Sequence, residues 1–318
     1  MYINENKVIA FVSSLDSHER VRWLTTLNAL MQGAVVIDVE RMSVEQKQGC
    51  LIAIVANPDP FSLVLLPNLR WIQSVWAGVE RLIQDLHYTQ LPIVRLVDPQ
   101  LAKTMAEAVL AWALYLHRDM PSYAQSQSLG QWQPRDYIKP ENRRIGVLGL
   151  GELGRTSCAA LQAAHFNVQG WSRQPKNING LRSYSGLDGL YSVLSTTDIL
   201  ICLLPLTNQT KHLLNSQMLN LLPKAASIIN FARGLIIDDG ALLDRLDSGH
   251  LNHAVLDVFA IEPLPADSWH WNHPSVTITP HVSAPTDLDT ASAIVCANVN
   301  RYFASGEIPA AINPATGY

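Results

Sequence analysis

The sequence predicts an α/β protein with two doubly wound parallel sheets. Two series of short apolar strands alternate with helical patterns, a polar, turn-rich segment (121–141) separates the series, and a glycine turn follows the first strand of the second series. The chain has 318 residues, so each series has enough residues to bury a core of its own. We therefore expect two domains.

The first series begins with an apolar strand and an amphipathic helix. The strand is predicted near residues 8–12, the helix over about 17–31, and further short strands near 35–39, 51–56 and 70–75. Asp98 and Pro99 then interrupt the pattern before an Ala-rich helical stretch, which begins near Leu101 and contains no proline until Pro121. We interpret this stretch as a helix that crosses between the domains.

The second series repeats strand, turn and helix from Arg144 onward. Apolar strands are predicted near residues 144–148, 168–171, 199–203, 227–230 and 254–257. A last helix, over roughly 285–304, has no strand after it in that sheet, so we expect it to return to the N-terminal domain. The predicted domains are residues 101–285 and a discontinuous domain of residues 1–100 plus 286–318.

Composition and charge exclude several classes of protein. Hydrophobic residues make up 48% and charged residues 16%, which is typical of compact globular chains. Met1–Phe11 lacks the features of a signal peptide, and no apolar run is long enough to span a membrane. The net charge of −4 and the scattered basic residues make nucleic acid a poor candidate partner. We expect a cytoplasmic protein with reduced thiols at Cys50, Cys158, Cys202 and Cys296.

A glycine turn follows the first strand of the second series and opens a helix. Gly149 permits the tight turn, Gly151 lets a pyrophosphate approach the backbone, and Gly154 lets helix and strand pack closely. The helix N-terminus then faces the anion. The alternative is a flexible turn, but the strand and helix around it favour a dinucleotide site, with Glu152 and Leu153 beside the glycines. We therefore expect a Rossmann-like cofactor domain inserted in a flavodoxin-like substrate domain.

The end of the next strand predicts which dinucleotide binds. An NAD site usually carries an acidic residue there, which binds the ribose 2′-hydroxyl. Here the strand ends in Trp171-Ser172-Arg173, without an acid. Ser172 can donate a hydrogen bond and Arg173 can bind a 2′-phosphate, with Lys176 close behind. An isolated arginine is often only a solvated surface residue, but the pattern favours NADPH, with NADH as the weaker alternative.

Three later strands end in polar residues, at the edge of a doubly wound sheet where ligands bind. The segments are Asn230-Phe-Ala-Arg233-Gly, Asp257-Val-Phe-Ala-Ile-Glu262-Pro-Leu and Thr279-Pro-His281. They resemble the D-2-hydroxyacid dehydrogenase family, whose spacing matches the 29 residues from Arg233 to Glu262 and the 19 from Glu262 to His281. Each residue alone is more often an ion-pair partner or a structural side chain, so the interpretation rests on the joint spacing. No carboxylate–histidine spacing suggests a metal site.

The resemblance covers most of the chain and implies roles for these and other residues. Arg233, Glu262 and His281 are expected to be catalytic, with Arg233 and His281 also contacting the substrate. The stretch Trp76-Ala77-Gly78-Val79 is similar to the family's substrate-carboxylate loop. There, backbone N–H groups would bind the carboxylate and Trp76 would form a wall of the substrate pocket.

Further cofactor contacts are implied at later strand ends. The loop Leu204-Pro205-Leu-Thr with Thr210 is similar to the family's cofactor-side loop, and Phe231, Ala232 and Asp257 end the next two strands. Segments 171–173, 248–251, 271–274 and the Gly317-Tyr318 end look closest to the family's glyoxylate/hydroxypyruvate reductase A branch. The resemblance also implies a homodimer paired through the nucleotide domains.

The chemistry of 2-oxo acid reduction explains these residue types. A cation is needed beside the carboxylate and the carbonyl oxygen, because negative charge develops on that oxygen, and Arg233 supplies it. His281 is the expected proton donor, and a carboxylate at Glu262 raises the pKa of its imidazole. We therefore expect NADPH-preferring reduction of small 2-oxo acids, glyoxylate and hydroxypyruvate, to 2-hydroxy acids. The alternatives are an NAD-dependent D-2-hydroxyacid dehydrogenase for a larger acid and a non-catalytic NAD(P)-sensing protein.

Overall fold

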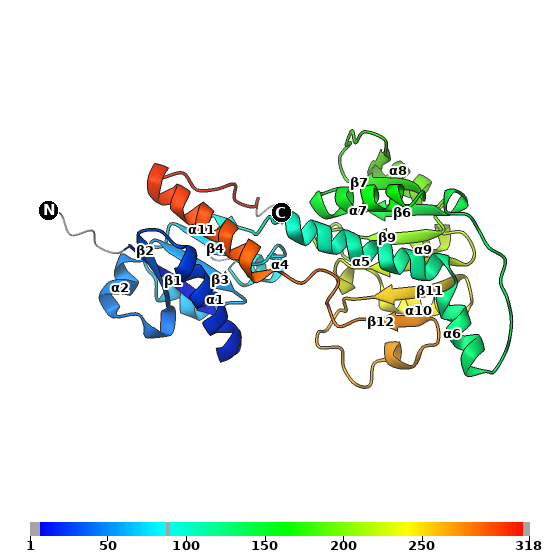
Figure 1. Ribbon diagram of the computed structural model, residues 1–318, viewed down its shortest axis with the longest axis horizontal. Helices are drawn as coiled ribbons and strands as arrows, with labels where there is room; N and C mark the ends of the chain where they lie inside the picture. Colours follow the sequence, from blue (N-terminus) through cyan, green and yellow to red (C-terminus); the bar gives the residue numbers. More distant parts are fainter. Residues whose placement is uncertain (1–6, 87–89, 314–318) are drawn as a thin grey trace. The chain divides into compact units, whose positions relative to one another are not determined.

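A computed structural model of the chain describes residues 7–86 and 90–313 (Figure 1). The chain divides into two compact units. The N-terminal unit comprises the residues up to Gln100 together with those from Thr286 onward, and the central unit comprises Leu101–Pro285. The Gly317-Tyr318 end, which resembles one branch of the family, lies outside the described residues.

The N-terminal unit is built on a parallel sheet with the strand order β2-β1-β3-β4-β5. The last helix of the chain, α11, packs beside α1, where Val295 and Val299 share a buried apolar cluster with Trp23 and Leu27. This helix therefore belongs to the core of the N-terminal unit. The strands are β1 (Lys7–Ser13), β2 (Ala34–Asp38), β3 (Ile52–Ala56), β4 (Trp71–Ser74) and β5 (Ile93–Val94). The helices are α1 (Ser17–Leu30), the 3-10 turn η1 (Val39–Arg41), α2 (Val44–Gly49), α3 (Pro60–Val64), α4 (Glu80–Asp85) and α11 (Leu288–Ser305).

The central unit is built on a second parallel sheet, with the order β12-β11-β10-β9-β6-β7-β8. Its strands are β6 (Arg144–Leu148), β7 (Asn167–Ser172), β8 (Arg182–Ser185), β9 (Ile199–Cys202), β10 (Ala226–Asn230), β11 (Leu251–Leu256) and β12 (Val276–Ile278). Its α-helices are α5 (Pro99–His117), α6 (Met120–Ser128), α7 (Glu152–Ala163), α8 (Gly186–Leu194), α9 (Ser216–Leu221) and α10 (Asp239–Asp247). The 3-10 turns are η2 (Pro140–Asn142), η3 (Gly234–Ile236) and η4 (Trp269–Asn272).

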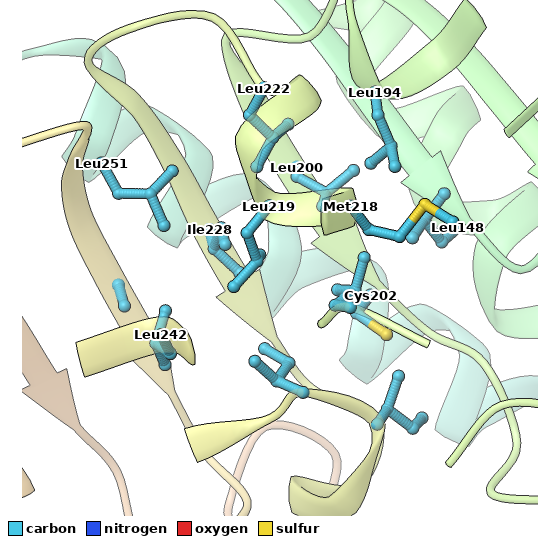
Figure 2. Packing of buried hydrophobic residues seen from close by; sticks show 14 of the residues in the cluster. Leu148, Leu194, Leu200, Cys202, Met218, Leu219, Leu222, Ile228, Leu242 and Leu251 are labelled. Carbon is cyan, nitrogen blue, oxygen red and sulfur yellow. The ribbon is translucent and has the colours of Figure 1, made fainter. Parts of the chain in front are cut away.

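Helices cover both faces of the central sheet. On one face, Met105 and Val109 of α5 share a buried cluster with Leu161 of α7 and with strand residues. On the other face, Met218 and Leu219 of α9 belong to a second buried cluster that includes side chains of β9 and β10 (Figure 2). Because both faces are covered, the inner strands are almost continuously apolar, and these short apolar runs are easy to recognise in the sequence.

The strand orders identify the edge at which ligands bind in each unit. The order reverses between β6 and β9 in the central sheet and between β1 and β3 in the N-terminal sheet. These are the orders of Rossmann-like and flavodoxin-like sheets, which bind ligands outside the carboxyl ends of their strands near the reversal. The predicted fold class is therefore confirmed.

The structure also contains elements that the sequence patterns did not reveal. Helix α6 occupies the start of the segment that was predicted to be polar and turn-rich. Its proline lies in the first turn, where proline is tolerated, and none of its residues is buried, so it has no apolar stripe. Strand β8 lies at one edge of the central sheet and is incompletely buried, and β5 has only two residues. Such short or exposed elements carry little periodic signal.

The cysteines are buried free thiols. Burial raises the pKa of Cys158 and of Cys202 to about 12, so both thiols are protonated at neutral pH. Within the described ranges, no helix combines the length and the apolar character that crossing a membrane requires.

The glycine turn after β6 depends on close backbone contacts. Gly149 has a φ of +104°, and a Cβ atom there would lie 2.6 Å from the carbonyl oxygen of Leu203. A Cβ atom on Gly154 would lie 1.8 Å from the carbonyl oxygen of Gly149. At Gly151, by contrast, an added Cβ would meet no atom within 4 Å. The first and third glycines therefore permit packing, whereas the second leaves open space at the start of α7.

Gly154→Ala is expected to destabilise the protein by about 2 kcal/mol or more, because its methyl group would push α7 away from the turn. Gly49→Ala is the matched control, since Gly49 is exposed at the end of α2 and an added Cβ there meets no atom within 4 Å. Thermal unfolding of the two variants measures the difference. An unchanged Tm for Gly154→Ala would contradict the close packing.

Candidate active site

Arg233, Glu262 and His281 lie on three loops at one edge of the central sheet. Arg233 directly precedes η3 after β10, Glu262 lies in the loop after β11, and His281 lies in the turn after β12. These strands are parallel neighbours, so their carboxyl ends point to the same edge. The fold therefore brings together three residues that the sequence separates by 48 positions, from 233 to 281.

Glu262 and His281 form a hydrogen-bonded ion pair. The Nδ1 atom of His281 lies 2.7 Å from Oε2 of Glu262, and Oε1 of Glu262 accepts a hydrogen bond of 2.9 Å from the backbone N–H of Phe259. Both carboxylate oxygens are thus engaged. The His281 side chain is 52% exposed, and with Nδ1 bound to Glu262 its Nε2 atom is the ring nitrogen available to a substrate.

The electrostatics of the pair favour the charged form of both partners. The hydrogen bond that the imidazole donates to Glu262 raises the pKa of His281, against the opposing effects of burial and of the nearby Arg233 charge. Burial alone would raise the pKa of Glu262, but the hydrogen bonds from His281 and Phe259 and the positive charges of His281 and Arg233 lower it overall. The two shifts agree in direction, and Arg233 lies close enough to affect both.

Asp257 organises the turn that carries His281. This residue is only 2% exposed, and its carboxylate accepts hydrogen bonds from the Thr279 hydroxyl (2.6 Å) and from the backbone N–H groups of Val282 (2.8 Å) and Ser283 (2.9 Å). Its backbone carbonyl accepts a further bond of 2.9 Å from the N–H of His281. His281 has a φ of +55°, a conformation that costs a non-glycine residue on the order of 1 kcal/mol. The bonds to Asp257 hold the turn in this conformation.

The Arg233 turn is held by its neighbours and contacts the Glu262 loop. Asn230 donates to the carbonyl oxygen of Arg233 (3.1 Å) and accepts from the N–H of Ala232 (3.2 Å), and Nη1 of Arg233 donates to the carbonyl oxygen of Ala232 (2.7 Å). A Cβ atom on Gly234 would lie 2.0 Å from the carbonyl carbon of Phe259. Only glycine therefore allows the Arg233 turn to lie directly against the loop whose N–H binds Glu262.

The glycine turn after β6 suits a dinucleotide. The open space in front of Gly151 lies at the N-terminus of α7, where backbone N–H groups and the helix dipole favour a phosphate group. Glu152 and Leu153 begin this helix, and Glu152 is paired with Arg155. Leu204 and Pro205 follow β9, and the Thr210 hydroxyl donates to the carbonyl oxygen of Pro205 (2.7 Å). Phe231 and Ala232 are buried immediately after β10.

The residues predicted to select NADPH differ in their surroundings. Arg173 and Lys176 are exposed after β7, and Nη1 of Arg173 donates a hydrogen bond of 3.2 Å to Oε1 of Gln209. Ser172 is 7% exposed, and its hydroxyl donates to the carbonyl oxygen of Gln174 (2.8 Å) instead of pointing to solvent. Thr210 in the loop after β9 could be predicted from the sequence but Gln209 could not, because a surface glutamine has no sequence signal of its own.

The predicted substrate-carboxylate loop, residues 76–79, lies after β4 in the N-terminal unit. Val79 precedes α4 and is 4% exposed. The Trp76 ring contacts the Trp23 ring edge-to-face at 5.8 Å and packs against the apolar core of that unit. The indole is therefore anchored by core packing on at least one side. Within the described ranges, no three His, Cys, Asp or Glu side chains are grouped so that they could hold a metal ion.

Comparison with known proteins identifies the family. Residues 110–283 match the model of the D-isomer specific 2-hydroxyacid dehydrogenase NAD binding domain. Glyoxylate/hydroxypyruvate reductase A of Serratia proteamaculans is 36% identical over 266 residues, which cover 82% of this chain and 85% of the relative. The Yersinia enterocolitica protein of the same name is 34% identical over 306 residues, which cover 94% of this chain and 97% of the relative.

Solved structures agree with this assignment. A D-isomer specific 2-hydroxyacid dehydrogenase from Xanthobacter autotrophicus, in complex with NADPH and MES, superposes with a TM-score of 0.92 at 33% identity, covering 98% of this chain and 100% of that one. An NADPH-dependent glyoxylate/hydroxypyruvate reductase from Sinorhizobium meliloti, in complex with NADP and sulfate, gives 0.90 at 28% identity with the same coverage. The predicted resemblance is confirmed, and the chain belongs to the D-isomer specific 2-hydroxyacid dehydrogenase family.

Proposed function

We propose that this protein reduces small 2-oxo acids, glyoxylate and hydroxypyruvate, to the corresponding 2-hydroxy acids, with NADPH as the preferred reductant. The observation that carries the proposal is the 2.7 Å contact between His281 and Glu262, formed close enough to Arg233 for its charge to act on both. The relatives named glyoxylate/hydroxypyruvate reductase A and the neighbours solved with NADPH or NADP support the same substrates and cofactor.

Arg233 and His281 are proposed to contact the reacting groups. The Arg233 guanidinium binds the substrate carboxylate and stabilises the negative charge that develops on the carbonyl oxygen. The Nε2 atom of His281 donates a proton to that oxygen, and Glu262 raises the pKa of the imidazole and so favours its protonated form beforehand. When bound, NADPH supplies the hydride that completes the two-electron reduction. Backbone N–H groups of Ala77, Gly78 and Val79 are proposed to hold the substrate carboxylate, with Trp76 as a pocket wall.

Residues of the central unit are proposed to hold the cofactor. Gly149, Gly151 and Gly154 would place the pyrophosphate at the N-terminus of α7. Arg173 and Lys176 would bind the 2′-phosphate, with Ser172 shaping the turn that presents them. Further contacts are proposed from Glu152, Leu153, Leu204, Pro205, Thr210, Phe231, Ala232 and Asp257.

We propose that residues 101–285 form the cofactor domain and that residues 1–100 plus 286–318 form the substrate domain.

We further propose a cytoplasmic location, which the free buried thiols support. We also propose a homodimer paired through the cofactor domains. Light scattering of the purified chain tests the dimer, and a monomer at micromolar concentration would contradict it.

Steady-state kinetics with NADPH and NADH against glyoxylate, hydroxypyruvate, pyruvate and phenylpyruvate test the function directly. We expect the highest kcat/KM for glyoxylate or hydroxypyruvate with NADPH. A preference for phenylpyruvate with NADH would instead indicate a dehydrogenase for larger acids. Tight NADPH binding without oxidation by any of the four acids would indicate a sensor.

His281→Asn is expected to lower kcat by at least about a hundredfold, because the variant loses the proton donor while asparagine tolerates the positive φ. His212→Asn is the matched control: His212 also has a positive φ (51°), is exposed, and lies 3.9 Å from a carboxylate, that of Asp238. Stopped-flow measurement of NADPH oxidation compares the two. Near-wild-type turnover in His281→Asn would exclude His281 as the acid.

Arg233→Lys is expected to lower kcat/KM about a hundredfold, because lysine lacks the planar fork of the guanidinium.

Glu262→Gln is expected to change the pH dependence of reduction. Since His281 must be protonated, kcat/KM falls as the pH rises through the His281 pKa, which the hydrogen bond donated to Glu262 raises. Removing the carboxylate's charge should therefore move this fall to lower pH. The measurement is the pH profile of kcat/KM, which reports on the free enzyme. If the alkaline limb of the Glu262→Gln profile coincides with that of the wild type, Glu262 does not set the His281 pKa.

Arg173→Ala is expected to raise the Kd of NADPH about tenfold to a hundredfold with much less effect on NADH, because charged hydrogen bonds contribute roughly 1.5–3 kcal/mol. Arg182→Ala is the control, since it removes an equal charge from an exposed residue at the amino end of β8. Fluorescence titration with both cofactors gives the ratio. An NADPH/NADH ratio that is unchanged by Arg173→Ala would refute the assignment.

A further inference from the structure

Gln209 connects the loop after β9 with the loop after β7. Its Oε1 atom accepts the 3.2 Å hydrogen bond from Nη1 of Arg173, and both side chains are exposed. Strands β7 and β9 flank β6 on either side in the central sheet. The contact therefore spans the strand that ends in the glycine turn, and it joins the two loops on either side of that turn.

The backbone of Gln209 is held by a compact hydrogen-bonded turn. Its N–H donates to the Thr207 hydroxyl (3.3 Å), the N–H of Thr207 donates to the Thr210 hydroxyl (2.8 Å), and that hydroxyl donates to the carbonyl oxygen of Pro205 (2.7 Å). At the start of the same loop, Leu203 packs directly against Gly149. Gln209 therefore has a fixed backbone position relative to the glycine turn, from which its side chain reaches Arg173.

The chemistry of the two side chains determines what this contact can do. An arginine guanidinium carries five N–H donors, and the bond from Nη1 to Gln209 engages only one of them. The amide oxygen of glutamine is neutral and leaves the charge of Arg173 intact. A carboxylate at the same position would compete with a phosphate for the guanidinium and would repel the phosphate itself.

We propose that Gln209 is a specificity-determining residue for NADPH: its amide oxygen orients Arg173 toward the adenosine 2′-phosphate without neutralising the guanidinium. This inference rests on the proposed NADPH preference and on the role of Arg173 in it. Gln209 acts through Arg173 and is a positioning residue. Its side chain selects between the two cofactors through its lack of charge.

Binding of adenosine nucleotides to the full chain tests the proposal without relying on turnover. Isothermal titration calorimetry compares 2′,5′-ADP, which carries the 2′-phosphate, with 5′-AMP, which lacks it. Gln209→Glu is expected to weaken 2′,5′-ADP about tenfold and to change 5′-AMP less than about twofold, as expected for the loss of one charge-assisted contact. Gln209→Asn, whose amide is too short for the same contact, is expected to weaken 2′,5′-ADP about threefold.

Asn208→Asp is the matched control because it makes the same amide-to-acid change in the adjacent exposed residue of the loop. It should weaken 2′,5′-ADP less than about threefold, since general charge effects at an exposed site are small. In an Arg173→Ala background, Gln209→Glu should lose most of its effect, because the contact it alters is gone. That result would support the proposal.

Three results would overturn the proposal. If Gln209→Glu and Asn208→Asp weaken 2′,5′-ADP equally, the contact with Arg173 has no specific role. If Gln209→Glu leaves 2′,5′-ADP binding unchanged while Arg173→Ala weakens it, Gln209 is excluded but the proposed NADPH preference stands. If Arg173→Ala itself leaves 2′,5′-ADP binding unchanged, the role of Arg173 and the inference about Gln209 both fail.

Discussion

The buried carboxylate of Asp257 is the interaction on which the geometry of the candidate active site depends. A carboxylate that is removed from water costs several kcal/mol unless donors replace its hydration. Here a hydroxyl and two backbone N–H groups do so, and all three belong to the turn that carries His281. The folded chain satisfies the charge only when this turn adopts its observed path. The same bonds hold His281 at a positive φ, which a free loop would rarely populate.

Close backbone contacts at glycine residues also fix the neighbouring loops at this edge of the central sheet. Gly234 lets the Arg233 turn lie against the Phe259 loop, and the N–H of Phe259 in turn holds Glu262. Gly149 and Gly154 make the corresponding contacts on the cofactor side, with Leu203 and with each other. A methyl group at these positions would overlap backbone atoms, so the distances between neighbouring loops are set by the absence of a side chain. The site is therefore rigid where loops of different strands meet.

The charges at this edge oppose one another in a way that suits acid catalysis. Arg233 favours the neutral form of His281, whereas Glu262 favours the imidazolium and has the larger effect. The Arg233 cation can thus lie near His281 while the pKa of the imidazole stays raised. Without Glu262, the positive charge proposed to bind a 2-oxo acid would lower the pKa of the histidine proposed to protonate it. The proposed reaction therefore needs both the Glu262 carboxylate and the Arg233 guanidinium.

The sequence by itself determined the alternation of strands and helices, the glycine turn and the identity of the residues at three strand ends. These features are local: apolar periodicity, turn chemistry and spacing within a motif can be recognised without knowledge of distant segments. It did not reveal α6, in which no residue is buried, or β8, which lies at a sheet edge, because neither has a periodic apolar pattern. Only the tertiary structure decided that Glu262 meets His281, that Asp257 supports the turn beneath, that Trp76 packs on Trp23 and that Gln209 reaches Arg173. Each of these contacts joins segments far apart in the chain, and their geometry follows from strand order and packing rather than from any local pattern.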